Sequence, residues 1–140
     1  LTSAKTEPIL TPHIREMARL TGLSDKEILK NKLEIARQFS ASLNSIIILK
    51  GPHTLIVFPE GDVYINSTGN EGLATGGTGD VLTGIITGFV AQGLSSRDAA
   101  VAGVYIHGLA ADLAAKNGRI GLTASDVLEA IPAAILAVES

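Results

Sequence analysis

The chain has 140 residues, of which 46% are hydrophobic and 18% charged, with a formal net charge of −3. This length fits one domain or part of a larger one, and the low aromatic content of 4% means that Ala, Val, Ile and Leu must build the core. No Lys/Arg cluster is present to neutralise phosphates, which argues against nucleic acid as a partner. The absence of cysteine excludes a disulfide framework and a thiolate metal site.

Targeting and membrane signals are missing from the sequence. No apolar run approaches the ~20 residues that span a bilayer, and Leu1–Lys5 lacks the regions of a signal peptide. The chain also lacks an initiator Met. We therefore expect a soluble, cytoplasmic protein that does not bind membranes, and a chain cut from a longer one.

The first elements expected along the chain are a strand and several helices. The apolar piece Pro8–Thr11 predicts a short strand that ends at Pro12, and residues 14–20 predict a short helix. Ser24-Asp25-Lys26-Glu27 matches a capping box, which predicts a helix start. A longer helix is expected over Asn31–Leu43 because apolar residues recur there at helical spacing.

A strand and a hairpin are expected next. Ser45–Leu49 is a continuous β-branched and Leu run, typical of a strand that is buried on both faces. Lys50–His53 predicts a turn, and two further strands are expected over 54–58 and 63–66. Pro59–Asp62 is the turn between them. The pattern indicates a hairpin on an otherwise buried sheet.

A loop and a helix are expected after the hairpin. Ser67–Gly79 is rich in Gly, Thr and Asn and predicts a loop, followed by a helix over Val81–Gln92 that Gly93 ends. Gly84 and Gly88 lie one turn apart in this helix and would permit close approach of another backbone, within the fold or between subunits.

Two further helices are expected in the last part of the chain. Ser95–Asp98 predicts the start of a helix to about Asn117, and Thr123–Asp126 caps a final helix that Pro132 should kink or restart. The order of strands and helices is that of an α/β fold. Helices outnumber strands, so we expect the first strands of the sheet to lie upstream of Leu1.

The glycine-rich run up to Asp80 is the most informative stretch. Glycines let the backbone present N–H groups without side-chain obstruction, and at a helix N-terminus such groups bind anions. Asp80 is unusual there because a carboxylate repels a phosphate; it can orient or deprotonate a hydroxyl that attacks phosphorus. The alternative is that Asp80 is only an N-cap beside a flexible turn. A P-loop is excluded because no Lys follows the glycines, and Leu82 excludes a Rossmann fingerprint.

Four stretches of the sequence resemble one known family. Gly77–Asp80, opening a helix, resembles the anion hole of the ribokinase-like superfamily, and the longer string Asn70–Gly84 resembles its NAD(P)H-hydrate dehydratase branch. Leu10–Met17 resembles the family's Pro-His-Pro-Gly-Glu segment, and Ile48–Thr54 its Leu-Lys-Gly-x-x-Thr segment. Tyr105–Ala110 resembles a further family stretch. The active centre would lie at Ala74–Asp80.

The resemblance implies a fold and a reaction. We expect a ribokinase-like sheet with flanking helices, incomplete here, with residues 1–140 as the C-terminal part of a single domain. The family's enzymes are lyases that repair hydrated NADH and NADPH with Mg²⁺ and a nucleotide, ADP in bacterial and archaeal members and ATP in eukaryotic ones. The nucleotide phosphorylates the ring hydroxyl, phosphate leaves, and the double bond returns. We also expect a homo-oligomer that requires the upstream part of the domain, with little activity in the isolated chain.

The resemblance also implies roles for particular residues. Asp80 would be the catalytic residue that orients or deprotonates the substrate hydroxyl, and His13 would contact the hydrated dinucleotide. Glu16 would reach magnesium through water, with no direct metal ligand. The backbone would form the anion hole at Gly76, Gly77, Thr78 and Gly79. The nucleotide would be bound by Lys50, Gly51, Pro52, His53, Thr54 and Gly79.

Other residues of these stretches are expected to be structural. We expect His107 to be a packed or hydrogen-bonded core residue, and Asn66 and Asn70 to brace the loop. The chain departs from the family pattern at Ile14-Arg15, where Pro-Gly is usual, which makes the turn beside His13 uncertain. Two alternatives stay open: a small-molecule kinase of the same superfamily, and an inactive nucleotide-binding fragment.

Overall fold

The computed structural model describes residues 7–118 and 120–139. It separates into two compact units, Leu1–Asn66 (unit 1) and Ser67–Ser140 (unit 2). Both strands and helices are present, so the expected α/β class is confirmed.

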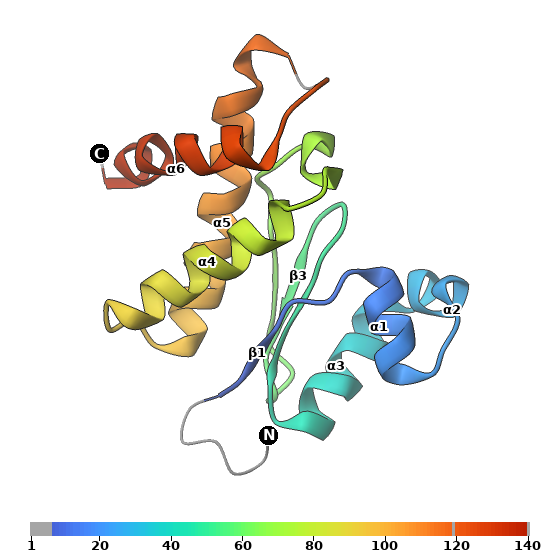
Figure 1. Ribbon diagram of the computed structural model, residues 1–140. Coiled ribbons are helices and arrows are strands. Elements are labelled where there is room, and N and C mark those ends of the chain that lie inside the picture. The colour runs from blue at the N-terminus through green and yellow to red at the C-terminus, as the bar shows by residue number, and fades with distance from the viewer. Residues whose placement is uncertain (1–6, 119, 140) are drawn as a thin grey trace. The chain divides into compact units, whose positions relative to one another are not determined.

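The described part of unit 1 is built on a mixed four-stranded sheet of order β1-β2-β3-β4 (Figure 1). Its strands are β1 (Ile9–Leu10), β2 (Ile46–Leu49), β3 (Leu55–Val57) and β4 (Val63–Ile65). β1 pairs with β2 in parallel, whereas β2, β3 and β4 pair antiparallel. All four residues of β2 are buried, which confirms the strand expected there. The hairpin expected from the turn residues is formed by β3 and β4.

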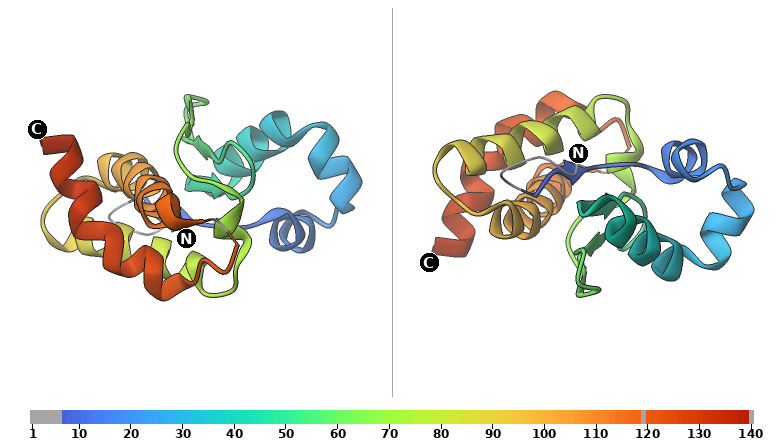
Figure 2. Two further views of the ribbon diagram at one scale, coloured as in Figure 1. Left: turned by 90° about the horizontal axis from the view of Figure 1, so that it is seen from above. Right: turned by 90° about the horizontal axis from the view of Figure 1, so that it is seen from below.

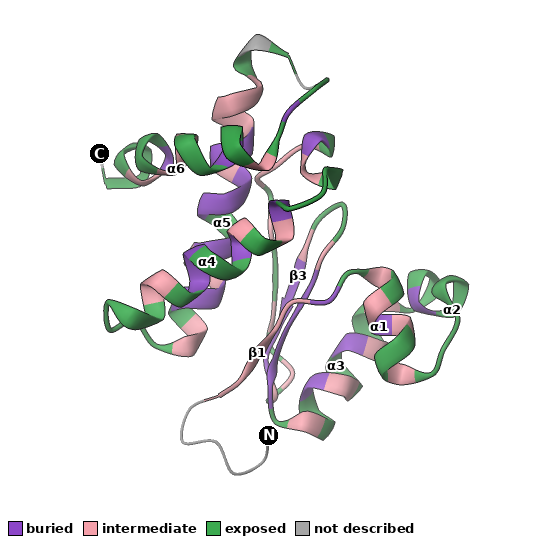
Figure 3. Cartoon of the chain, viewed as in Figure 1, coloured by how far each residue is buried: buried purple, intermediate pink, exposed green. Residues whose placement is uncertain are grey.

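Helices pack on this sheet in unit 1. They are α1 (Ile14–Thr21), α2 (Asp25–Lys30) and α3 (Lys32–Leu43), all close to their expected bounds. Each contributes one buried side chain to the core, and alternate residues of β2 and β3 supply the rest, since every second residue of a strand lies on the same face. The strand β3 is buried along its length (Figure 3). These core residues are Met17, Ile28, Ala36, Ile47, Leu49, Leu55 and Val57.

Among the described residues of unit 2, the regular elements are all helices. Its helices are α4 (Thr78–Ala91), α5 (Ser96–Ala114) and α6 (Ala124–Glu139), with 3₁₀ turns η1 (Glu71–Ala74) and η2 (Ala115–Asn117). α5 packs against both α4 and α6, as the views of Figure 2 show. Alanines at the contacts let the helices approach closely around a small core: Ile85, Ile106, Ala110, Ala111, Leu122, Val127 and Ala134.

Two expectations for the stretch before α4 are wrong. It is not simply a loop, because it contains η1, and α4 already begins at Thr78 rather than Val81. Of the kink or restart expected at Pro132, the restart is not found, because the last helix runs through Pro132 as one element. Since Pro132 is exposed, the carbonyl that loses its helical partner there lies near solvent.

The close approach that Gly84 and Gly88 would permit is found at other glycines. No atom lies within 4 Å of a Cβ built on Gly84 or Gly88. A Cβ at Gly103 would instead meet Ile86 Cγ1 at 2.5 Å, and one at Gly108 would meet Thr68. Unit 2 therefore depends on glycines of α5, not of α4, for its tightest packing.

No helix among the described residues combines the length and the hydropathy that crossing a membrane requires.

Candidate functional site

The predicted site residues form two groups, one in each unit. Unit 1 contains His13, Glu16 and the segment Lys50–Thr54, and unit 2 contains Gly76–Asp80. The structure brings together the members within each group.

The unit 1 group lies where two parallel strands end. His13 follows β1 and Lys50 follows β2, and an isolated parallel bridge joins these two residues. The Lys50 N–H donates to the carbonyl of Pro12 at 2.9 Å, which fixes the two chain segments side by side. In open α/β sheets, ligands bind outside the carboxyl ends of parallel strands. His13 and Lys50 are therefore placed where a ligand site is expected in such a fold.

His13 and Glu16 form a capping box at the start of α1. His13 Nδ1 accepts from the Glu16 N–H at 3.1 Å, and a Glu16 carboxylate oxygen accepts from the His13 N–H at 2.7 Å. Ile14 and Arg15 are thereby the first helical residues, a position that needs no glycine. The departure from the family pattern leaves a regular helix start, and the exposed Arg15 guanidinium lies 3.9 Å from the Asp25 carboxylate.

Glu16 and Lys50 form an ion pair in the same group. The Lys50 Nζ lies 3.8 Å from Glu16 Oε2, and its side chain is only 25% exposed. The backbone N–H of His13 lowers the pKa of Glu16, and the positive charge of Lys50 adds to the effect. Glu16 therefore balances the charge of Lys50, a role that sequence analysis did not assign to it.

The segment after Lys50 is an exposed turn. Gly51, Pro52 and His53 are all exposed, and His53 has a φ of 55°, in the left-handed region. The Thr54 hydroxyl donates to the Gly51 carbonyl at 3.1 Å and closes the turn. The predicted nucleotide residues of unit 1 thus form one accessible loop that begins at the cation Lys50, whereas Gly79 lies in unit 2.

In unit 2, α4 begins on a glycine. Gly77 is the N-cap with a φ of 89°, and no side chain caps the helix. The N–H groups of Asp80 and Val81 both donate to the Gly77 carbonyl. Within the described residues, the N–H groups of Gly76, Gly77 and Gly79 have no hydrogen-bond acceptor. These free donors at the positive end of a helix are the arrangement that binds an anion.

The start of α4 is held from its buried side. Thr78 is 5% exposed, and its hydroxyl lies 2.7 Å from the Leu73 carbonyl and 2.9 Å from the Thr75 carbonyl. His107 Nε2 lies 2.8 Å from the Thr78 carbonyl oxygen and is buried, so the expected hydrogen-bonded core histidine is confirmed. The Thr75 hydroxyl donates to the Leu122 carbonyl at 3.0 Å, which ties this turn to the segment before α6.

The other end of the loop is tied to α5. Asp112 accepts from the Gly69 N–H at 2.8 Å and from the Asn70 amide at 2.9 Å. Asn70 also accepts from the Gly72 N–H at 3.0 Å, which confirms that this side chain braces the loop. Sequence analysis missed Asp112, although a single acid in the apolar stretch 104–114 of a buried helix is a signal that could have identified it.

An acidic residue stands three positions after the N-cap in each α-helix within residues 7–118 and 120–139. In α1, α2, α5 and α6 this acid exchanges hydrogen bonds with the capping residue. In α3, Glu34 accepts from Gln38. Asp80 of α4 is exposed and, among the described side chains, has no hydrogen-bond partner. The alternative of Asp80 as a simple N-cap is wrong, since Gly77 is the cap.

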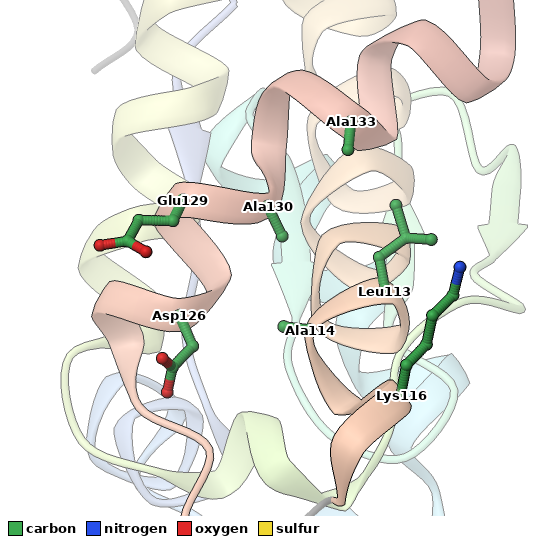
Figure 4. A pocket seen from close by; sticks show the side chains of 7 residues that line it. All are labelled: Leu113, Ala114, Lys116, Asp126, Glu129, Ala130 and Ala133. Carbon is green, nitrogen blue, oxygen red and sulfur yellow. The ribbon is translucent and has the colours of Figure 1, made fainter.

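A separate hollow of about 420 Å³ lies between α5 and α6 (Figure 4). Its lining includes Leu113, Lys116 and Glu129 but none of the predicted site residues. The Ala114 and Ala130 side chains point into it, whereas the Glu129 carboxylate points away. It is an open surface depression without converging polar groups, so it does not identify the site.

Comparison with known proteins places both groups of residues within one family match. A sequence model of the NAD(P)H-hydrate dehydratase family matches residues 1–133, a range that includes every predicted site residue. The chain belongs to the NAD(P)H-hydrate dehydratase family. It is 48% identical over 125 residues to the bifunctional NAD(P)H-hydrate repair enzyme Nnr of Moorella thermoacetica, covering 89% of this chain and 24% of that protein.

Two solved structures show the fold of this NAD(P)H-hydrate dehydratase family member. An ADP/ATP-dependent NAD(P)H-hydrate dehydratase of Bacillus subtilis, co-crystallised with ATP/Mg²⁺ and soaked with CoA, is 38% identical with a TM-score of 0.88, covering 95% of this chain and 52% of that one. A ribokinase-like superfamily protein of Enterococcus faecalis is 36% identical with a TM-score of 0.80, covering 92% of this chain and 44% of that one. The fold is ribokinase-like, and the chain spans about half the length of these structures or less.

Proposed function

We propose that this chain is the C-terminal part of a single ribokinase-like domain that repairs hydrated NADH or NADPH by nucleotide-dependent dehydration. The observation that carries the proposal is the start of α4, where three glycine N–H groups have no acceptor and Asp80 is exposed without a partner. A related enzyme with a TM-score of 0.88 is an ADP/ATP-dependent NAD(P)H-hydrate dehydratase.

Asp80 is the catalytic residue of the proposal. The hydroxyl of the hydrated ring attacks the terminal phosphorus of ADP or ATP, its proton passes to Asp80, and the bridging P–O bond breaks to release the shortened nucleotide. The C–O bond then breaks and phosphate leaves with the electron pair. Loss of a proton from the neighbouring carbon restores the double bond. Phosphorylation helps because phosphate is a far better leaving group than hydroxide.

The anion hole supplies electrostatic stabilisation in this proposal. The N–H groups of Gly76, Gly77 and Gly79 face the transferred phosphoryl group, together with the positive end of α4. These donors are already oriented by the bonds that hold Thr78, so little reorganisation is needed when charge develops. The N–H of Thr78 is not one of these donors, because it already donates to the Thr75 carbonyl at 3.5 Å. Thr78 instead holds the turn in place.

Unit 1 supplies nucleotide and substrate contacts in the proposal. Lys50 acts as a point charge for a phosphate, and the turn Gly51–Thr54 contacts the rest of the nucleotide. His13 contacts the hydrated dinucleotide with the half of its side chain that is exposed. Glu16 is 45% exposed, which fits an outer contact to Mg²⁺ through water. Mg²⁺ bound to nucleotide phosphates keeps several waters and needs few protein ligands, and it would neutralise charge on the phosphates.

The proposal includes the upstream part of the domain. The chain spans 52% of the related Bacillus structure, so we expect the remaining half to contribute to the dinucleotide site and the isolated chain to turn over poorly. We also propose a homo-oligomer, whose test is the mass of the complete protein in solution.

The test is an assay of the protein, with any upstream sequence of its reading frame, on hydrated NADH or NADPH with Mg²⁺ and ADP or ATP. Recovery of the reduced-nicotinamide absorbance, lost in Asp80→Asn, would support the proposal and identify the phosphoryl donor. A stable phosphorylated product without recovery would instead indicate a small-molecule kinase. Nucleotide binding without either product would indicate an inactive nucleotide-binding fragment.

A further inference from the structure

His107 contacts one end of a peptide group whose other end belongs to the anion hole. The carbonyl of Thr78 and the N–H of Gly79 are the two ends of the same peptide bond. His107 Nε2 lies 2.8 Å from that carbonyl oxygen. Because a carbonyl can only accept, His107 must carry a proton on Nε2. The same peptide is thus bonded on its buried side and has a free donor on the other.

The start of α4 lacks the usual means of fixing a helix end. In α5 and α6 the capping hydroxyls of Ser95 and Thr123 accept the N–H of the third helical residue, at 3.1 Å and 3.2 Å. Such a side chain would compete with a ligand for the first N–H groups of the helix. Gly77 has no side chain, so the donors stay free and the position of the turn must be fixed in another way.

We infer that His107 is a positioning residue that aims the Gly79 N–H at the bound anion, an inference that rests on the proposed function. A trans peptide is planar, so its C=O and N–H point in opposite directions. Holding the Thr78 oxygen against buried His107 therefore turns the Gly79 N–H away from the core. The hydrogen bond also polarises the peptide, which makes the Gly79 N–H a stronger donor.

The neighbouring contacts do not replace His107. The Thr78 hydroxyl has one proton and donates it to Leu73 or Thr75, so it fixes the side chain and not the plane of the peptide that follows. The rest of α5 holds the far end of the loop, through Asp112 at Gly69. Because α4 begins at Thr78, the Thr78 carbonyl also accepts the N–H of Leu82 in the first helical turn, and His107 adds a side-chain hydrogen bond to the same oxygen from the buried side.

The experiment compares His107→Leu, which removes the donor, with His107→Gln, whose amide can reach the same carbonyl. Both are made in the protein with any upstream sequence of its reading frame. In His107→Leu we expect the amide resonance of Gly79 to shift and kcat for dehydration to fall about 10–100-fold with little change in KM, since one anion-hole donor acts mainly in the transition state. His107→Gln should keep the Gly79 amide resonance near its wild-type position and retain most of kcat.

Ile106→Ala is the matched control, because Ile106 is a neighbouring core residue of α5 whose loss lowers stability but whose apolar side chain cannot donate to the Thr78 carbonyl. An unshifted Gly79 resonance in folded His107→Leu, or a kcat no lower than that of Ile106→Ala, would overturn the inference. If His107→Leu does not fold, His107→Asn takes its place, because its shorter amide withdraws the donor. If the wild-type protein shows no dehydration, the proposed function fails, and the Gly79 resonance still decides the role of His107.

Discussion

Helices α1 and α4 begin with the same arrangement of positions but use it differently. In α1 the capping residue His13 and the acid Glu16 satisfy each other's backbone N–H groups. In α4 the capping residue is Gly77, and Asp80 at the matching position has no partner among the described residues. An acid in the first turn stabilises any helix through the helix dipole, so its presence alone does not indicate a functional site. The missing side-chain cap leaves backbone donors and a carboxylate free together, and this difference is the reason that the start of α4 is the proposed ligand site.

The largest expected effect comes from Asp80→Asn, compared with Asp126→Asn at the matching position of α6. Asp126 accepts from the Thr123 hydroxyl at 2.6 Å and is part of the cap of α6, whereas Asp80 has no such contact. Loss of a general base costs about 10²–10⁴-fold in rate, so we expect Asp80→Asn to lower kcat by that amount with little change in thermal unfolding. Asp126→Asn should lower stability and leave kcat nearly unchanged. Equal effects of the two variants on kcat would remove the distinction between the helix starts.

The next largest effect is expected for Asp112→Ala, which tests whether the open start of α4 depends on a loop held from α5. The substitution leaves the Gly69 N–H and the Asn70 amide without their shared acceptor. Loss of charge-assisted hydrogen bonds of this kind costs about 2–3 kcal/mol, which urea unfolding would measure. Glu129→Ala, an exposed acid of α6, should stay within about 0.5 kcal/mol of wild type. A loss below that of Glu129→Ala would show that the loop does not need Asp112.

The sequence predicted elements more reliably than contacts. The capping box at Ser24–Glu27 and the apolar run ending at Leu49 are local signals, and both elements were predicted close to their observed bounds. The glycine-rich run likewise predicted an open helix start, although the helix begins at Thr78.

What the sequence could not predict depends on residues far apart in the chain. Asp112 reaches Gly69 across 43 positions, and His107 reaches Thr78 across 29, so no local pattern could indicate either pair. The partner of Gly84 could not be predicted for the same reason, since a glycine permits close contact but does not specify a neighbour.

A smaller effect is expected for Gly77→Ala. A side chain at the φ of 89° is strained by about 1–2 kcal/mol, and its Cβ would meet Ala124 Cβ at 3.2 Å. We therefore expect a loss of stability of that size in urea unfolding, with a fall in kcat as the donors move. Gly76→Ala is the control, because no atom lies within 4 Å of its added Cβ and its φ is not positive. Equal losses in the two variants would mean that the left-handed cap does not set the geometry of α4.

The smallest effect concerns the closed start of α1 and its dependence on pH. The pKa of Glu16 is lowered from 4.5, first by the His13 N–H and then by Lys50, so the folded state favours the ionised carboxylate. Its contribution to stability is present above pH 4.5 and is lost as the pH falls through the lowered pKa. In the wild type, the Glu16 carboxylate should account for less than about 1 kcal/mol of the unfolding free energy that is lost between pH 6 and 3, because it is half exposed. Glu16→Gln should remove this part of the pH dependence, which urea unfolding would measure. Lys50→Met keeps the capping box and should retain most of the dependence. If Lys50→Met abolished it instead, the ion pair and not the cap would control Glu16, and α1 would owe its closed start to charge.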